Sequence, residues 1–372
     1  MRHLSVTVTT AAALLLAAAS PAASVPSPTT VIGDVQKAME KLAATPGVVG
    51  AVGGVYLDGK SAGRGTAGSR LLGGNGGTIP ADSRFRIGSQ TKTMVGTVLL
   101  QLVNEGRVGL DDKLARLLPE VAAGGLVERA GEITVRQLVQ HTSGVPDWYS
   151  LEGSSEPAFD VFDFTAYHRP IDIVKMTRGR PRTGEPGEKF TYSNTGYTLL
   201  GMIIEKVTGH ALARELDQRL FRPLGMTRTY QVTGPPEGID GPHGHGYYPD
   251  AGGALRDVDR FNASWGNGAG GVVSTTQDVS RFHRAFYQGR LLPSSLRDVL
   301  TGGPRASART GTSPCGDLKI FGGSAPGYVA LTFASTNGRE QIAVSVTHSA
   351  ADDGAVIHAA IETVETAICP AA

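Results

Sequence analysis

The sequence predicts a mixed α/β (α+β) fold, in which an antiparallel sheet built from both ends of the chain is flanked by helices and accompanied by a mainly helical second lobe. Strand patterns lie near the two ends of the chain, and helical patterns fill the middle. A helix is also expected at each end. An antiparallel sheet that joins the two ends, with both terminal helices packed against it, is the simplest arrangement that buries these elements together.

The N-terminal stretch MRHLSVTVTTAAALLLAAASPAAS has the pattern of a secretory signal peptide. A short basic start precedes an apolar core at Ala11 to Ala19 and small residues near Ala22 to Ser24 that resemble a cleavage site. The apolar core is shorter than the roughly 20 residues that span a bilayer. We expect residues 1–25 to be removed and residues 26–372 to form one secreted, extracellular domain; a retained anchor is the alternative.

The two ends of this domain are expected to form the sheet body, over about 31–85 and 300–369. After a Ser/Pro/Thr-rich linker, DVQKAMEKLAAT has helical periodicity, and GVVGAVGGVYLDGKSAGRGTAG is typical of two strands joined by a turn at Asp58-Gly59. Near the C-terminus, GYVALTFAS and EQIAVSVTHS predict a hairpin closed by TNG. An amphipathic helix in DGAVIHAAIETVETAI follows it.

The residues between, about 86–299, are mostly helical in pattern. Strand signals are sparse there, and helical periodicity begins after Ser89 and returns in four further segments. These segments are TVRQLVQ after Thr134, TGYTLLGMIIEKVTG, ALARELDQRLFRPLG and TTQDVSRFHRAFYQG. A helical insertion between two halves of a sheet implies a cleft between lobe and sheet, which is a preferred location for a small-molecule site.

Composition excludes some classes of partner. The formal charge of +1 and the scattered Lys and Arg residues give no basic stripe, so neither nucleic acid nor an anionic membrane is expected as a partner. The chain also lacks a P-loop, a Rossmann glycine pattern after a strand and the G-x-S-x-G elbow of α/β-hydrolases.

The stretch FRIGSQTKTM places Ser89 and Lys92 three positions apart where a helix is expected to begin. Residues at i and i+3 share a helix face, so the ammonium can reach the hydroxyl while the free N–H groups of the first turn point at the same spot. This arrangement suits the formation of an alkoxide. The spacing alone is weak evidence, because a helix-starting serine beside a solvated lysine has the same pattern.

A second motif, in TYSNTGYTLL, places Tyr192 and Asn194 at the entry to a helix, with Asn194 expected as its N-cap. S-x-x-K at Ser89 and Y-x-N at Tyr192 each occur once in the chain. Together they resemble the active site of the serine penicillin-interacting enzymes. The chain is similar to the class C β-lactamase-type serine hydrolases, and most to the secreted actinobacterial D-alanyl-D-alanine carboxypeptidases, also through RFRIGSQTK, ITVRQLVQHTSGV and SWGNGAGGVVSTTQDV.

This resemblance implies a role for each residue of the two motifs. Ser89 would be the nucleophile, Lys92 would accept or tune its proton, and Tyr192 would be the general acid and base for the leaving amine and for water. The backbone N–H of Ser89 would form half of an oxyanion hole. Asn194 would bind the substrate amide, and Trp265 would pack against the substrate, although a core tryptophan is the alternative for Trp265.

The chain departs from the family at the third motif, K-T-G or H-T-G, which is expected on a strand shortly before PGY. Here the sequence is KIFGGSAPGYVA, and we expect Gly323-Ser324-Ala325 to take the place of His-Thr-Gly. A YGLGL-like strand before Cys315 is missing as well. Each lost donor to the transition state typically costs about 10² to 10³ in rate. Ser324 is a candidate for the missing hydroxyl, and Arg309 for the missing charge.

Cys315 and Cys369 are the two cysteines of the chain. An even count in an exported protein favours a disulfide, and two free buried thiols are the alternative. The bridge would stabilise the fold by about 4 kcal/mol in the chain-entropy model. The positions of the two cysteines also resemble those in the carboxypeptidase subgroup, which supports the pairing.

His243 and His245 in PHGHGYYPD are two apart, but zinc needs three or four ligands and the sequence indicates no partner for them. We therefore expect a polar surface loop, no metal and no cofactor. His141, in QHTSGV, belongs to a segment that resembles a structural part of the family. We expect it to hold the fold and not to act as a base.

The resemblance implies a secreted serine hydrolase that works through an acyl-enzyme on D-Ala-D-Ala peptides of cell-wall peptidoglycan or on β-lactams. Esterase or D-aminopeptidase activity on small amides stays open, because one fold supports many substrates. The missing third motif motivates a hypothesis of a different class. In it, the chain is a catalytically impaired protein that binds peptidoglycan or β-lactam.

Overall fold

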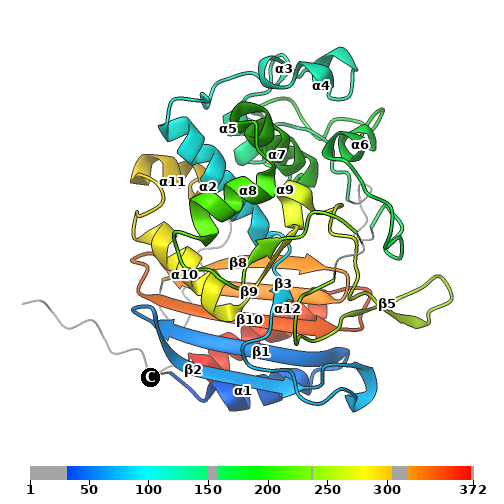
Figure 1. Cartoon of the computed structure of the whole chain (residues 1–372), viewed down its shortest axis with the longest axis vertical. Coiled ribbons are helices and arrows are strands. Elements are labelled where there is room, and N and C mark those ends of the chain that lie inside the picture. The colour runs from blue at the N-terminus through cyan, green and yellow to red at the C-terminus, as the bar shows by residue number, and fades with distance from the viewer. Residues whose placement is uncertain (1–31, 150–156, 236–237, 304–316, 370–372) are drawn as a thin grey trace, which may run out of the picture. The chain divides into compact units, whose positions relative to one another are not determined.

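A five-stranded antiparallel sheet joins the two ends of the chain in this computed structural model, as the sequence predicts (Figure 1). β1, from the N-terminal part, pairs with β10, from the C-terminal part, and Val52 lies opposite Ser345. β8 forms one edge of the sheet and β2 the other. In spatial order the strands are β2 (Lys60–Gly68), β1 (Val48–Leu57), β10 (Glu340–His348), β9 (Tyr328–Ser335) and β8 (Leu318–Ala325).

The structure describes residues 32–149, 157–235, 238–303 and 317–369, all of which belong to one compact unit. The predicted signal peptide, Arg309 and Cys315 lie outside these residues, so the cleavage, the charge at Arg309 and the disulfide remain predictions. Cys369 is described and buried, at 2% exposed, in the core formed by the terminal helices and the sheet.

The two predicted hairpins are both present. Asp58 and Gly59 join β1 to β2 with φ of 49° and 79°, which is the conformation of a turn that suits the twist of a hairpin. β9 pairs with β10 from Tyr328 opposite Thr347 to Ala334 opposite Gln341. All eight residues of β9 are buried, because the sheet is covered on both faces.

Helices from the two chain ends cover one face of the sheet (Figure 1). They are α1 (Val35–Ala43), α12 (Gly354–Thr363) and the π-helical turn η4 (Val364–Ile368) that continues α12. α1 lies so close to β2 that a Cβ on Gly65 would stand 2.4 Å from the carbonyl oxygen of Val35. The opposite face packs against α10 (Thr276–Tyr287) and the helical lobe.

The lobe is built around two long helices, α2 (Gln90–Asn104) and α7 (Asn194–Thr208), which are buried over most of their lengths. α5 begins with the capping box between Thr134 and Gln137, at the point where the sequence predicts a helix start. The shorter elements are η1 (Leu72–Gly74), α3 (Leu114–Leu117), α4 (Pro119–Ala123), α5 (Val135–Val139), α6 (Pro170–Lys175), α8 (Leu212–Leu216), η2 (Asp217–Phe221), α9 (Asn267–Gly270) and α11 (Ser294–Thr301).

Two small sheets within this region were not predicted. One has the order β3–β7–β4, from β3 (Phe85–Arg86), β7 (Val272–Ser274) and β4 (Tyr230–Gln231). The other is a hairpin of β5 (Tyr247–Pro249) and β6 (Leu255–Asp257). Strands of two or three residues are too short to show a period, but β3 fixes the residues that lead into α2.

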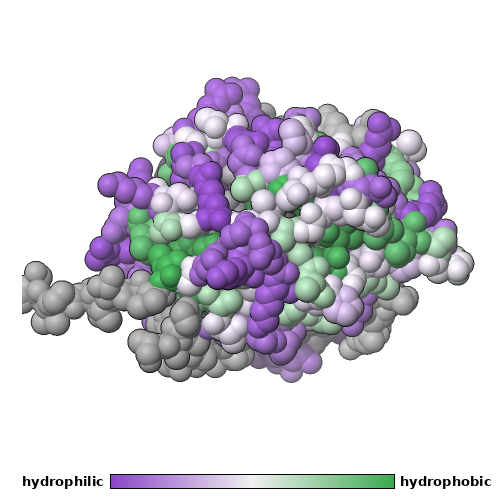
Figure 2. Space-filling model, turned by 90° about the horizontal axis from the view of Figure 1, so that it is seen from below, coloured by the Kyte–Doolittle hydropathy of each residue, from purple (hydrophilic) through white to green (hydrophobic). Residues whose placement is uncertain are grey.

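Among the described residues, the large hydrophobic side chains that are exposed are those of Tyr167 and Leu255. Hydrophilic residues lie between and over hydrophobic ones on the face seen in Figure 2. Among the described residues, no helix combines the length and the apolar character needed to cross a membrane.

His283, on α10, is buried, and its ring centroid lies 4.2 Å from that of Phe321 on β8. Neither ring nitrogen has a hydrogen-bond partner among the described residues. Burial without a partner disfavours the charged imidazolium, and it lowers the pKa of His283 to about 3. The folded protein therefore holds His283 neutral where an exposed histidine would bind a proton.

This burial predicts loss of stability in mild acid. Between pH of about 6.5 and about 3 the unfolded chain binds a proton that folded His283 does not, so the free energy of unfolding falls as the pH falls, by roughly 1 kcal/mol per pH unit. His283→Leu should flatten this dependence in chemical denaturation measured at several pH values. His358→Ala, at an exposed histidine, should keep the wild-type slope. An unchanged slope in His283→Leu would contradict this assignment.

Candidate active site

A tight turn brings Ser89 to the start of α2. β3 is held by β7, the N–H of Ile87 donates to the carbonyl of Val272 at 3.1 Å, and Gly88 then turns the chain with φ of 51°. A Cβ on Gly88 would also stand 2.5 Å from the carbonyl oxygen of Ser324, so glycine is needed here twice over. Ser89 follows as the N-cap residue of α2 and is partly exposed.

The ammonium of Lys92 lies at the centre of the site and is 5% exposed. Its Nζ donates to Ser89 Oγ at 3.0 Å, to Asn194 Oδ1 at 2.7 Å and to the carbonyl oxygen of Ala269 at 2.7 Å. An ammonium has three N–H donors, and here each has an acceptor. The predicted proximity of Ser89 and Lys92 is therefore present, and the lysine is not solvated.

Tyr192, in the loop before α7, contacts Ser89 at the start of α2, as the two motifs imply. Its hydroxyl hydrogen-bonds Ser89 Oγ at 2.7 Å, and its ring centroid lies 4.9 Å from Lys92 Nζ. His141 stacks on the Tyr192 ring at 4.6 Å, and its Nδ1 accepts from the N–H of Ser193 at 3.1 Å. His141 thus supports the tyrosine and is not placed as a base, in agreement with its expected structural role.

Asn194 is at the site, but the expectation that it caps α7 is wrong. Ser193 is the N-cap, because its hydroxyl accepts from the N–H of Gly196 at 3.2 Å, and Asn194 is the first residue of the helix. Its amide is therefore free to bridge two groups: Oδ1 accepts from Lys92, and Nδ2 donates to Asp147 Oδ2 at 2.8 Å.

Asp147 is a site residue that the sequence analysis missed. Its Oδ1 accepts from the backbone N–H groups of Tyr149 at 3.1 Å and Asn194 at 3.2 Å, so the carboxylate fixes both the backbone and the amide of Asn194. Burial raises the pKa of the Asp147 carboxyl, while these N–H groups and the charge of Lys92 oppose the rise. Asp147 is a positioning residue, because it acts on Lys92 through Asn194.

The edge strand β8 completes the site with backbone. A Cβ on Gly323 would stand 2.1 Å from the carbonyl oxygen of Ile87 and 2.5 Å from the nitrogen of Ser89. Gly323 is therefore the glycine that lets the strand meet the nucleophile turn, while the position of the third motif on β8 stays a prediction. The two positions before it are Phe321 and Gly322.

Ser324 contributes its main chain to the site. A two-residue turn joins β8 to β9, so its closing pair, Ala325 and Tyr328, is a hydrogen-bonded pair. The next pair along the antiparallel ladder, Ser324 and Val329, is then a non-hydrogen-bonded pair. The N–H and C=O groups of Ser324 therefore point away from β9. On an edge strand that direction is open, and a Cβ on Gly88 would stand 2.6 Å from the nitrogen of Ser324. The amide of Ser324 thus faces the turn that carries Ser89.

No described side chain supplies the missing cation of the third motif on β8 next to Gly323. Phe321 takes the nearest position on the same face of the strand and packs against His283 and Tyr287. Lys319, further along β8, pairs with Asp317 at 3.0 Å. Among the described residues of β8, the resemblance's group for a substrate carboxylate therefore has no counterpart beside Gly323.

Trp265 lies within an aromatic cluster. It is 7% exposed, and its ring stacks on His168 at 3.6 Å and on Trp148 at 5.9 Å. Phe159 packs on it from a third direction at 4.7 Å. The structure thus favours the core tryptophan, which the sequence left as the alternative to a substrate contact.

The interpretation of His243 and His245 as a loop without a partner is also corrected. The structure places Asp259 beside them, with a ligand atom of each of the three residues within 4.8 Å of the others. Asp259 follows the β5–β6 hairpin and is too far along the chain to join a short sequence motif.

This fold and this arrangement of Ser89, Lys92 and Tyr192 are typical of the family of serine hydrolases with the β-lactamase fold. The sequence matches the family described as Beta-lactamase over residues 35–332, and the chain belongs to that family. The family predicted from the two motifs is therefore confirmed. A penicillin-binding protein of Bacillus subtilis is 31% identical over 235 residues, which are 59% of this chain and 48% of the Bacillus protein. The chain thus spans about half the length of that relative.

Solved structures with the same fold include two enzymes named for D-configured substrates. A D-stereospecific amidohydrolase from Streptomyces sp. has a TM-score of 0.73 and 31% identity, and the match covers 89% of this chain and 97% of that one. A D-amino acid amidase from Ochrobactrum anthropi SV3, complexed with L-phenylalanine amide, has a TM-score of 0.72 and 25% identity, covering 89% and 96%. The fold class predicted from the sequence is thereby confirmed.

The contacts of Asp147 predict that Asp147→Asn slows acylation. In Asp147→Asn, the new side-chain NH₂ group would face the N–H donors of Asn194. Because two donors cannot bond to each other, the Asn194 amide should turn away from Lys92. We expect kcat to fall by about 10- to 100-fold and its pH profile to shift, while the fold is kept. Asp250→Asn is a matched control, because Asp250 also accepts two backbone N–H groups but lies in the β5–β6 turn. Wild-type kcat and pH profile in Asp147→Asn would contradict the positioning role.

The close approach of β8 predicts that Gly323→Ala is damaging. The added methyl would overlap Ile87 and Ser89, so the strand or the turn must shift, at a cost of about 1–3 kcal/mol in stability. Activity should fall at least tenfold, measured with the thermal midpoint in the same samples. The neighbouring Gly322→Ala is the control, since its methyl would meet only the Leu331 side chain, at 3.3 Å. Equal effects of the two substitutions would show that close packing at Gly323 is not required.

Proposed function

We propose that the chain hydrolyses amide bonds of small D-configured substrates through an acyl-enzyme on Ser89. The observation that carries this proposal is the convergence of Lys92 Nζ and the Tyr192 hydroxyl on Ser89 Oγ, at 3.0 and 2.7 Å. A serine hydroxyl is a weak nucleophile and needs an adjacent base. A binding protein without turnover would not need this hydrogen-bonded set around a buried ammonium.

These contacts support the following order of steps. Because the three donors of Lys92 already have acceptors, the oxygen of Tyr192, 2.7 Å from Ser89 Oγ, would take the Ser89 proton once its own proton has left. Oγ then attacks the substrate carbonyl, and Tyr192 passes the proton to the leaving amine as the acyl ester forms. A water molecule then loses a proton to Tyr192 and attacks the ester. Tyr192 passes this proton to Ser89 Oγ as the ester bond breaks, and the product acid leaves.

Backbone groups stabilise the negative oxygen of the tetrahedral intermediate in this scheme. The N–H of Ser89 lies at the N-terminus of α2, where the helix dipole favours negative charge. The N–H of Ser324 on the edge of β8 is the second donor. Neither depends on the lost side chains of the third motif, so the proposal retains an oxyanion hole.

The residues of β8 bear on the substrate class. Among the described residues, β8 has no cation beside Gly323 that could bind a free C-terminal carboxylate of the substrate. This supports neutral amides and short peptides with a D-residue as the acyl group. The names of the two amide-cleaving neighbours support D-configured amides. A D-Ala-D-Ala carboxypeptidase or β-lactamase-like activity is the second candidate, supported by the penicillin-binding relative. The signal-like N-terminus supports secretion and a peptidoglycan-derived substrate.

A comparison of matched substrates tests this proposal. The purified chain is assayed with D-alanine and L-alanine para-nitroanilide, and with a peptide that ends in D-Ala-D-Ala. We expect the D-anilide to be cleaved at least tenfold faster than the L-anilide and faster than the peptide. Ser89→Ala should lose this activity entirely, and Tyr192→Phe should lower it by about 10² to 10⁴. Ser61→Ala, at an exposed serine of β2, is the control and should be unaffected.

Three results would change the assignment. Preference for the peptide would favour the carboxypeptidase, and a stable penicillin adduct without turnover of any substrate would favour the impaired binding protein. Cleavage that survives Ser89→Ala would refute the mechanism itself.

A further inference from the structure

A second polar cluster lies at the base of the β5–β6 hairpin, outside the hydrogen-bond network of Ser89. Tyr247 pairs with Asp257, and the N–H of Val258 donates to the carbonyl of Gly246 at 3.0 Å, so the two chain segments continue side by side below the hairpin. His243 and His245 are two apart on one segment, and their rings lie parallel, 5.0 Å apart. Extending the register places His245 opposite Asp259 on the other segment.

Each imidazole of this cluster is already oriented by its Nδ1. His243 Nδ1 lies 2.5 Å from the carbonyl oxygen of Gly241, and His245 Nδ1 lies 2.7 Å from Asp257 Oδ2. An oxygen acceptor at Nδ1 favours the tautomer that leaves Nε2 with its lone pair, which is the arrangement found behind most metal-ligating histidines. Asp257 and Gly241 thus orient both rings. His243 Nε2 also shares a proton with Asp259 Oδ1, and a binding ion would displace that proton.

The third group, Asp259, completes a set of three ligands. One potential ligand atom from each of His243, His245 and Asp259 lies within 4.8 Å of the others, and Asp259 Oδ1 is 2.7 Å from His243 Nε2. His243 is 7% exposed and Asp259 20% exposed in their side chains. Two imidazoles and one carboxylate suit zinc and related divalent transition metals, with a water molecule in the remaining position.

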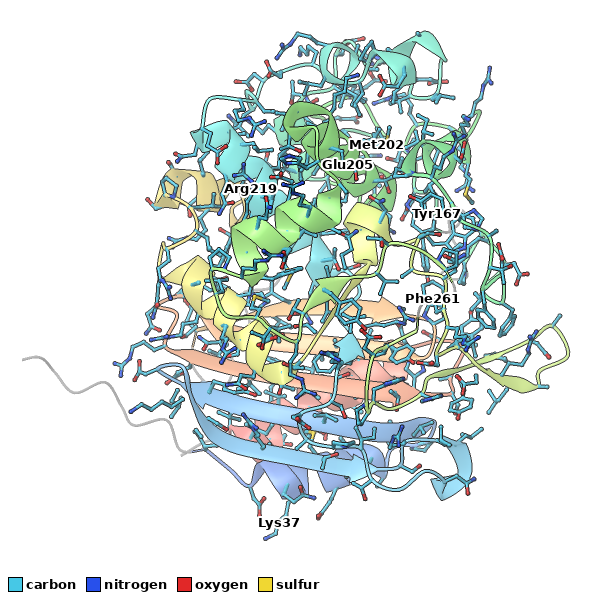
Figure 3. The ribbon with its side chains drawn as sticks, in the orientation of Figure 1. Lys37, Tyr167, Met202, Glu205, Arg219 and Phe261 are labelled. Atoms are coloured by element: carbon cyan, nitrogen blue, oxygen red, sulfur yellow. The ribbon has the colours of Figure 1, made fainter. Side chains whose placement is uncertain are left out.

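Two arginines hold the backbone that carries these ligands. Arg70 Nε donates to the carbonyl of His243 at 3.1 Å, and Arg86 Nη2 donates to the carbonyl of Asp259 at 2.6 Å. Arg86 is buried, and its guanidinium lies over the ring of Phe261, labelled in Figure 3. Because both guanidiniums bind main-chain oxygens, the ligand side chains stay available while their backbones are fixed.

From this geometry we propose that His243, His245 and Asp259 bind one divalent transition-metal ion of the zinc class. Arg86 belongs to β3, which leads into the turn before Ser89. The ion therefore fastens the 241–259 segment beside the strand that positions the nucleophile. Its role is structural, and the proposal does not depend on the reaction at Ser89.

Zinc titration of the untagged full chain, freed of metal by dialysis against a chelator, tests the site. Isothermal titration should show one equivalent of Zn²⁺ per chain, and zinc should raise the thermal midpoint. His243→Ala and Asp259→Asn should each weaken binding at least 100-fold, and Asp257→Asn by about 10- to 100-fold. Co²⁺ in place of Zn²⁺ should give the visible absorption of a four-coordinate site, which reports on the wild-type chain even if a variant fails to fold.

His210→Ala is the matched control, because His210 Nδ1 also lies 2.7 Å from a carboxylate, that of Glu215, but the described residues offer it no third ligand. It should bind zinc like the wild type. Absence of a stoichiometric zinc equivalent in the wild type, or equal binding by wild type, His243→Ala and Asp259→Asn, would overturn the proposal. In that case the cluster is a set of histidine–aspartate pairs only.

Discussion

The hydrogen bonds of the buried Lys92 ammonium join the parts of the lobe on which the site depends. Through its three donors Lys92 connects the start of α2, the first residue of α7 and the carbonyl of Ala269 on α9. A buried ammonium is costly unless all its donors are paired, so these segments are held at fixed distances from one another. The same contacts bring Ser89 Oγ within reach of Tyr192. The same hydrogen bonds therefore serve both the packing of the lobe and the reaction. Asp147 adds to them, because its carboxylate accepts from Asn194 Nδ2.

A second constraint is the space between sheet and lobe, and glycines set it. Gly88 and Gly323 meet backbone to backbone, with no room for a methyl group on either side. This contact joins the edge strand β8 to the turn that presents Ser89, although the two lie far apart in sequence. It allows main-chain N–H groups to take part where the side chains of the expected third motif are absent. The loss at that motif therefore bears more on which substrates bind than on whether Ser89 can be acylated.

The sequence was sufficient for the elements with clear periods and for the residues with short-range motifs. The hairpins, the helices after Ser89 and Thr134, and the family followed from local patterns. Asp147 and Asp259 were missed because their partners are distant in sequence and a lone aspartate carries no pattern. The cap of α7 was misassigned by one residue, since serine and asparagine both cap helices well. The close approach of Gly323 to Ser89 was not predicted, because sequence letters do not show which glycine must touch the nucleophile turn.

The account depends most directly on the identity of the acylated atom. The decisive measurement is tandem mass spectrometry of peptides from the wild-type chain, quenched within seconds of mixing with a D-amino acid ester. The account predicts the acyl mass on Ser89, formed quickly and lost on longer incubation, and a slower rise of the same adduct in Tyr192→Phe. Acyl mass on another residue, or equal rates of adduct formation in Tyr192→Phe and wild type, would contradict it.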